Sequence, residues 1–128
     1  MQGLKMKTGS SKHAVILSGI MFGMMHIGNP EIEAIGSHVL IYYVVSGLFL
    51  SALTLFDNGL ELSIGYHAAN NIFAALMVSN DWQVFQTNAL YINTAPPALS
   101  WIELLVSGVL FCIYSCLMAL GKLSLIHI

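Results

Sequence analysis

Residues 35–56 read IGSHVLIYYVVSGLFLSALTLF, a run without a single Asp, Glu, Lys or Arg. A helix that crosses the hydrocarbon core of a bilayer needs about 20 mostly apolar residues. The run meets that length and therefore predicts a membrane-spanning helix. We expect the segments on either side of it to be membrane-embedded as well.

The composition of the whole chain agrees with a membrane protein. Of its 128 residues, 57% are apolar and 8% are charged, and the mean hydropathy is +0.79. A soluble domain carries about 25% charged residues, so this chain has too few polar side chains to cover a water-exposed surface. With four lysines, no arginine and a net charge of −2, it lacks the basic surface typical of nucleic-acid binding.

Three further apolar segments flank the central run, at about 14–28, 59–78 and 99–120. Together the four segments predict an all-α fold, a polytopic membrane helix bundle with about four transmembrane helices. Asn29-Pro30 should end the first segment, because proline cannot continue a helix and restricts the residue before it.

The connections between segments predict one tight turn and one long loop. Asp57-Asn58-Gly59 is typical of a turn, and Asn58 with Glu61 fits a capping box at the start of the third helix. Residues 79–98 contain several polar side chains and two consecutive prolines, which predicts a loop. Lysines occur only before the first segment and after the fourth, so the positive-inside rule places both termini in the cytoplasm.

Two histidines lie inside apolar segments, in Phe22-x-x-x-His26 and His67-x-x-x-Asn71. Ionisable groups at membrane depth are costly and usually functional. At 1.5 Å per residue, His26 lies about 18 Å beyond the start of its segment and His67 about 12 Å beyond the start of its own. Both depths are near the middle of a core about 30 Å thick, so we expect the two side chains to converge on one site.

Helical spacing gives each histidine a partner on its own segment. His67 and Asn71 share a helix face, with Asn70 and Ser63 on or next to it. Phe22 and His26 share a face by the same spacing. A purely structural role, in which these polar groups hydrogen-bond across helices and hold the bundle together, is the alternative interpretation.

The remaining candidate residues have simpler expected roles. Gly19 and Gly23 form a pair of small residues that allows another helix to approach closely. Solvated or interfacial positions are expected for four other ionisable residues: His13, His38, Glu31 and Glu33. Two histidines are one ligand short of a catalytic zinc site, and no His-Glu-x-x-His motif occurs.

Phe22-x-x-x-His26 followed by His67-x-x-x-Asn71 resembles the CPBP family, the CAAX-processing and bacteriocin-processing intramembrane endopeptidases also called Abi proteins. The text Asn58-Gly-Leu-Glu-Leu-Ser-Ile-Gly-Tyr-His67 is similar to the start of that family's third motif. The resemblance covers roughly residues 10–80 and reaches the fourth segment only by topology.

This resemblance implies a protease of the bacterial cell membrane with several spans. The catalytic residues would be His26, His67 and Asn71, with Phe22 supporting the motif. The substrates would be peptides or membrane proteins, such as CAAX-type tails or leader peptides, and nucleic acid would not be a partner. The mechanism would be glutamic, or metal-dependent with His26 and His67 as ligands of a divalent ion such as zinc.

The chain departs from the family at its first motif, Glu-Glu-x-x-x-Arg, which supplies the glutamate taken as the base and is absent here. We expect that motif upstream of Met1, so that residues 1–122 are part of a CPBP domain and this fragment alone is inactive. Residues 123–128 resemble the translation of a sequencing adaptor. A non-catalytic immunity or scaffold protein on the same fold, and a transporter fragment, are the alternative functions.

Overall fold

The computed structural model describes residues 9–102, 105–106, 108–110, 112–114 and 116–117. Its helices are α2 (Ser11–Met24), α3 (Pro30–Ile35), α4 (Val39–Asp57) and α5 (Glu61–Met77). Two short strands follow, β1 (Val78–Ser79) and β2 (Tyr91–Ile92). The described residues between 101 and 117 are also helical. The prediction of an all-α fold is confirmed.

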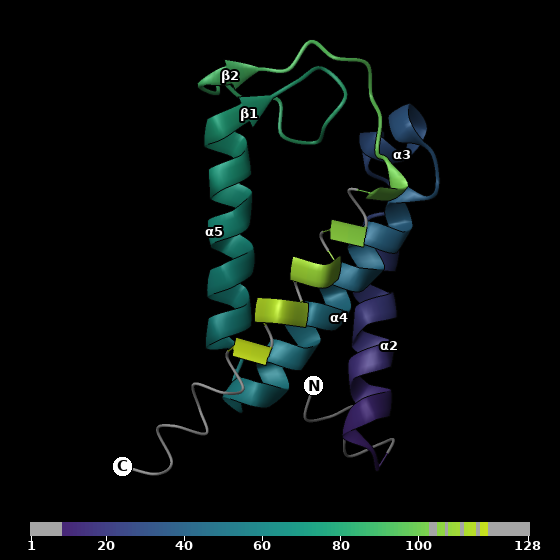
Figure 1. The fold of residues 1–128 in the computed structure, drawn as a ribbon, viewed down its shortest axis with the longest axis vertical. Coiled ribbons are helices and arrows are strands. Elements are labelled where there is room, and N and C mark those ends of the chain that lie inside the picture. The colour runs from purple at the N-terminus through teal and green to yellow at the C-terminus, as the bar shows by residue number, and fades with distance from the viewer. Residues whose placement is uncertain (1–8, 103–104, 107, 111, 115, 118–128) are drawn as a thin grey trace.

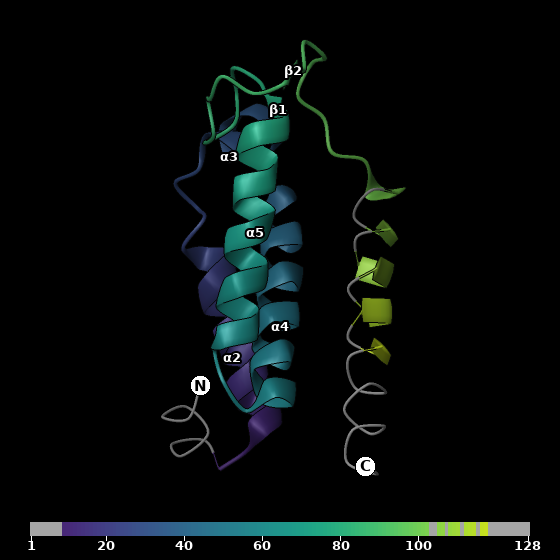
Figure 2. The ribbon, with the colours of Figure 1, turned by 90° about the vertical axis from the view of Figure 1, so that its left-hand side faces the viewer.

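Three helices form the body of the structure. Helix α4 lies between α2 and α5 and runs antiparallel to both, while α3, β1 and β2 gather at the end where α5 finishes (Figures 1 and 2). The described helical residues after position 100 stand to one side of these three helices (Figure 2). They contact the body through Tyr114, whose ring lies 5.7 Å from those of Phe49 and Tyr66.

Glycines bring α2 and α4 into close contact. A Cβ atom at Gly19 would lie 2.9 Å from the backbone nitrogen of Leu48, and one at Gly47 would lie 2.8 Å from the carbonyl oxygen of Gly19. A Cβ at Gly23 would lie 3.1 Å from the backbone nitrogen of Val44. The predicted role of Gly19 and Gly23 as an approach surface for another helix is therefore confirmed.

The turn between α4 and α5 differs from the predicted capping box. Asn58 adopts the left-handed conformation (φ 56°, ψ 20°) and ends α4, and its N–H donates to the carbonyl of Leu55 at 3.4 Å. Leu60 is the residue that precedes α5, without a side-chain capping bond. The prediction was wrong because asparagine tolerates the left-handed region, which a helix C-terminus favours. The hydroxyl oxygens of Thr54 and Ser63 lie 2.9 Å apart, and their hydrogen bond joins the two helices next to this turn.

Among the described residues, one helix is long and apolar enough to cross a membrane. It is α4, with 19 residues and a mean hydropathy of 2.1 in its most apolar window. Helices α2 and α5 have 14 and 17 residues, or about 21 and 25 Å at 1.5 Å per residue. The central segment is thus a helix of spanning length and composition, and both the span itself and the count of four spans stay predictions.

Large apolar side chains cover the outer faces of α2 and α5. Met21, Met24 and Ile64 are among many that are more than half exposed. Monomeric soluble proteins rarely expose contiguous apolar surface on this scale. The surface fits a helix group surrounded by lipid or by further helices.

The segment that follows α5 is non-helical up to residue 100, as predicted. Strand β1 pairs with β2 in parallel, with Val78 opposite Tyr91. Asn80 folds the intervening loop, because its Oδ1 accepts hydrogen bonds from the N–H groups of Trp82 (3.2 Å) and Gln83 (2.8 Å). The termini, with Lys5, Lys7, Lys122 and the expected adaptor residues 123–128, lie outside the described residues.

Candidate active site

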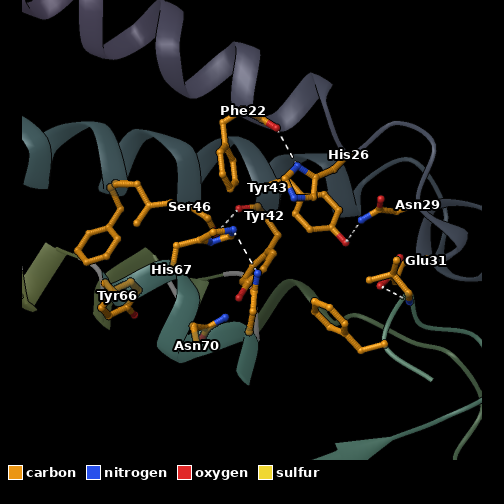
Figure 3. A pocket seen from close by; sticks show the side chains of 15 residues that line it. Phe22, His26, Asn29, Glu31, Tyr42, Tyr43, Ser46, Tyr66, His67 and Asn70 are labelled. Atoms are coloured by element: carbon orange, nitrogen blue, oxygen red, sulfur yellow. Dashed lines mark hydrogen bonds between the residues drawn. The ribbon is translucent and has the colours of Figure 1, made fainter. Parts of the chain in front are cut away.

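A cavity of about 150 Å³ lies between α2, α4, α5 and the loop that follows β1. Figure 3 shows side chains from all these elements pointing into it. The polar and ionisable residues that line it are His26, Asn29, Glu31, Tyr42, Tyr43, Ser46, Tyr66, His67, Asn70 and Asn71. All four residues that the sequence assigned to the site, Phe22, His26, His67 and Asn71, are among its lining residues.

His26 lies two residues beyond the end of α2, in a turn, and not within the helix as its spacing suggested. Its N–H donates to the carbonyl of Gly23 at 3.0 Å, which is the tighter bonding pattern typical of a helix end. Its half-buried imidazole Nδ1 lies 2.8 Å from the carbonyl oxygen of Phe22. A carbonyl only accepts, so Nδ1 carries a proton, and in the neutral form of the ring the lone pair is then on Nε2.

Two aromatic rings hold the imidazole of His26. Tyr43 of α4 stacks on it, with ring centroids 4.2 Å apart and an interplanar angle of 20°. The ring of Phe22 lies 4.7 Å away on a tilted plane. The Tyr43 hydroxyl accepts a hydrogen bond from Nδ2 of Asn29 at 3.3 Å.

His67 projects from the middle of α5 and is hydrogen-bonded to Asn71 one turn further on. The distance between Asn71 Nδ2 and His67 Nε2 is 3.2 Å. With the amide oriented so, its N–H₂ donates and Nε2 accepts, which leaves the proton of the neutral imidazole on Nδ1. In their neutral forms, the two histidines therefore have opposite hydrogen-bonding roles. His26 offers a lone pair as an acceptor, and His67 offers an N–H as a donor.

Phe22 connects the two histidines. Its ring lies 4.7 Å from that of His26 and 5.3 Å from that of His67. The residues come from segments 41 positions apart in the sequence, yet they line the same cavity (Figure 3). The expectation that the two histidines converge is confirmed.

Glu31 is the ionisable residue of this cavity that sequence reasoning missed. It was expected to be solvated, but only 9% of it is exposed. Its Oε1 accepts a hydrogen bond from the N–H of Val84 at 3.0 Å, and its Oε2 is buried without a partner in the described structure. Pro30 occupies the first turn of α3, where its fixed φ favours a new helix, and this helix turns Glu31 toward the loop.

The tyrosines of the cavity were also missed, although α4 carries a signal for them. Tyr42, Ser46 and Phe49 recur at helical spacing, which places them on one face of that helix. Ser63, by contrast, lies outside this cavity, because its hydroxyl bonds to Thr54. His13 is exposed and His38 lies at the start of α4, away from the cavity, as expected.

A metal ion in this cavity would need several side-chain ligands close together. No group of three or more His, Cys, Asp or Glu side chains comes together in the described part of the chain. A catalytic zinc usually has three protein ligands, and His26 and His67 supply two. The described residues alone therefore do not fit a zinc site.

The first 73 residues match a family of known proteases. The matching family model is that of type II CAAX prenyl endopeptidases, Rce1-like, over residues 1–73. The match includes Phe22, His26, His67 and Asn71. The chain belongs to the Rce1-like family. This family is membrane-embedded and proteolytic, so the chain is a member of a membrane protease family.

A bacterial relative is similar to just over half of the Rce1-like chain. The uncharacterized protein YyaK of Bacillus subtilis (strain 168) is 30% identical over 70 residues, which are 55% of this chain and 23% of the relative. The chain thus spans less than a quarter of the relative's length. No solved structure matches.

Proposed function

We propose that the protein of which this Rce1-like chain is a part is an intramembrane endopeptidase that hydrolyses peptide bonds of membrane-associated substrates. The observation that carries the proposal is the meeting of His26 and His67 across Phe22 in one cavity. The membership of this chain in a protease family supports the proposal. CAAX-type tails and leader peptides are the proposed substrate classes.

Peptide hydrolysis needs a base for the water, a donor for the developing oxyanion and a proton for the leaving amine. In the proposed mechanism, the Nε2 lone pair of His26 orients the attacking water and helps to deprotonate it, together with a glutamate from the family's first motif. The proton taken from the water is then returned to the nitrogen of the leaving amine as the C–N bond breaks. The Nδ1–H of His67, held in that tautomer by Asn71, donates to the oxyanion. Each histidine thus acts through the nitrogen that its own hydrogen bond leaves available.

The aromatic surroundings suit this chemistry. Rings from Tyr42, Tyr43, Phe49 and Tyr66 line the cavity beside the histidines. A site with little water strengthens every electrostatic interaction with the substrate. Hydrogen-bond donors fixed before the reaction then need no reorganisation as charge develops.

A metal-dependent version remains a prediction that the protein's chemistry can test. It would use His26 and His67 as ligands and would need a third ligand from another part of the protein. We expect activity to withstand prolonged treatment with a zinc chelator if the glutamic mechanism operates. Loss of activity that added zinc restores would establish the metal-dependent version.

The proposed topology follows the described helices. Helices α2 and α5 run in one direction and α4 in the other (Figure 1), so the start of α2 and the turn at Asn58 lie on the same side. Lys12 is at that end of α2, which the positive-inside rule makes cytoplasmic. We propose a multi-pass protein of the bacterial cell membrane with this end on the cytoplasmic side.

Substitution of the two histidines tests the function. In the full-length protein reconstituted in liposomes, His26→Ala and His67→Ala should each reduce the cleavage rate of a fluorogenic CAAX-type peptide by about 10²-fold or more, because general acid–base groups contribute about 10²–10⁴-fold. His13→Ala is the matched control, since His13 is exposed and outside the cavity. Wild-type rates in both cavity variants would exclude the proposed catalytic roles.

A further inference from the structure

The cavity holds a third group whose geometry is directed at His26. We propose that Tyr43, fixed by Asn29, is a positioning residue that sets the plane of the His26 imidazole and directs its Nε2 to the reacting water. This inference rests on the proposed function, because only a catalytic His26 needs such control. Figure 3 shows the three side chains together at one end of the cavity.

The backbone alone does not position His26 well. The residue follows the end of α2, and the turn around it is held by two hydrogen bonds, His26 N–H to Gly23 at 3.0 Å and Asn29 N–H to the His26 carbonyl at 3.0 Å. A turn tolerates more variation than a helix. A catalytic side chain at such a place needs support from its neighbours.

The hydrogen bond of the His26 imidazole leaves the ring free to rotate about that bond. Nδ1–H is tied to the carbonyl of Phe22 at 2.8 Å, which fixes one ring atom and the tautomer. The plane of the ring can still turn about that bond. The ring of Tyr43, stacked at 4.2 Å and 20°, restricts this rotation, because a stacked partner lies parallel to the plane it supports.

Tyr43 is itself connected to the turn that carries His26. Its hydroxyl accepts from Asn29 Nδ2 at 3.3 Å, and the N–H of Asn29 donates to the carbonyl of His26. Two hydrogen bonds thus connect His26 to Asn29 and Asn29 to Tyr43, and the stacked rings connect Tyr43 back to His26. These contacts attach the turn after α2 to helix α4, and this attachment holds the imidazole in place.

The kinetic test separates positioning from binding. A small misplacement of a catalytic group can reduce the rate by about 10²-fold, so Tyr43→Leu in the full-length enzyme should reduce kcat by about 10- to 100-fold while KM changes by less than about threefold. Tyr43→Phe keeps the ring and should retain most of the activity. Phe56→Leu also replaces an aromatic ring of α4 by leucine, at an exposed position, and should leave kcat unchanged.

A spectroscopic test does not depend on cleavage. In full-length protein labelled with ¹⁵N-histidine, we expect the ring nitrogens of His26 to report one tautomer, with the proton on Nδ1. Tyr43→Leu should broaden the ring signals of His26, because the plane of the imidazole is no longer held by a stacked ring, and Phe56→Leu should not. If the wild-type protein fails to cleave any peptide, the proposed function fails while this measurement still tests the role of Tyr43.

Two milder variants address the case in which Tyr43→Leu does not fold. Asn29→Ala and Tyr43→Phe remove the same hydrogen bond, so each should broaden the His26 ring signals to a similar degree, and the double variant should add little. A Tyr43→Leu enzyme with wild-type kcat and wild-type His26 ring signals would overturn the proposal. So would Asn29→Ala and Tyr43→Phe variants whose His26 signals equal those of the wild type.

Discussion

Asn71 and His67 lie one turn apart on α5, and the 3.2 Å hydrogen bond between them selects the nitrogen of His67 that carries the proton. The catalytic function proposed for this imidazole depends on that selection, because a ring in the other tautomer presents a lone pair where a donor is needed. The tautomer of a catalytic histidine is worth several orders of magnitude in rate in well-studied hydrolases. At the scale of single residues, Asn71 is thus an orienting group for its neighbour.

We predict that Asn71→Ala reduces kcat by about 10²-fold, in the range found when one stabilising donor is removed from a hydrolytic site. Asn88→Ala is the matched control, because Asn88 is exposed and is not among the residues that line the cavity. Steady-state kinetics on the full-length protein measure both. Equal rates for the two variants would show that the bond to His67 has no part in catalysis.

At the scale of elements, the contact between α2 and α4 determines where His26 lies. The contact depends on glycines, and Gly19 has no room for a side chain against the backbone of Leu48. Overpacking of a tight interface costs about 1–3 kcal/mol. Gly19→Ala should therefore lower the thermal midpoint of the detergent-solubilised protein and reduce its activity.

Gly65→Ala provides the comparison for this effect. Gly65 lies on α5 with nothing within 4 Å of the position that its Cβ would take, and alanine is the better helix former by about 1 kcal/mol. We expect a midpoint equal to or above that of the wild type. A Gly19→Ala protein as stable as Gly65→Ala would contradict the packing described for α2 and α4.

The link between α3 and the loop is the second contact that encloses the cavity. Glu31 accepts from Val84 N–H, and Val84 and Phe85 line the cavity wall. Leaving a buried hydrogen-bonding group without its partner costs about 1–3 kcal/mol, so Glu31→Ala should make residues 80–87 more sensitive to limited proteolysis. Glu33→Ala, at an exposed site on the same helix, should leave the digestion pattern unchanged, and equal digestion of both variants would argue against this link.

At the scale of the whole molecule, the sequence predicted the helices and the pairing of the histidines, because apolar length and helical spacing determine both. It did not predict the burial of Glu31, which depends on a loop 53 positions further along the chain. The left-handed Asn58 was misassigned because the same residue type favours both the start and the end of a helix. Tyr43 was missed since an aromatic residue in an apolar run is usually only packing.

The central claim is that His26 and His67 form one catalytic unit, and a double-substitution cycle on the full-length enzyme tests it most directly. Groups that act as a unit are strongly non-additive, so one loss makes the other nearly without effect. We predict that His26→Ala, His67→Ala and the double variant have cleavage rates within about tenfold of one another, all far below the wild type. Losses that multiply in the double variant, or wild-type rates in either single variant, would contradict the account.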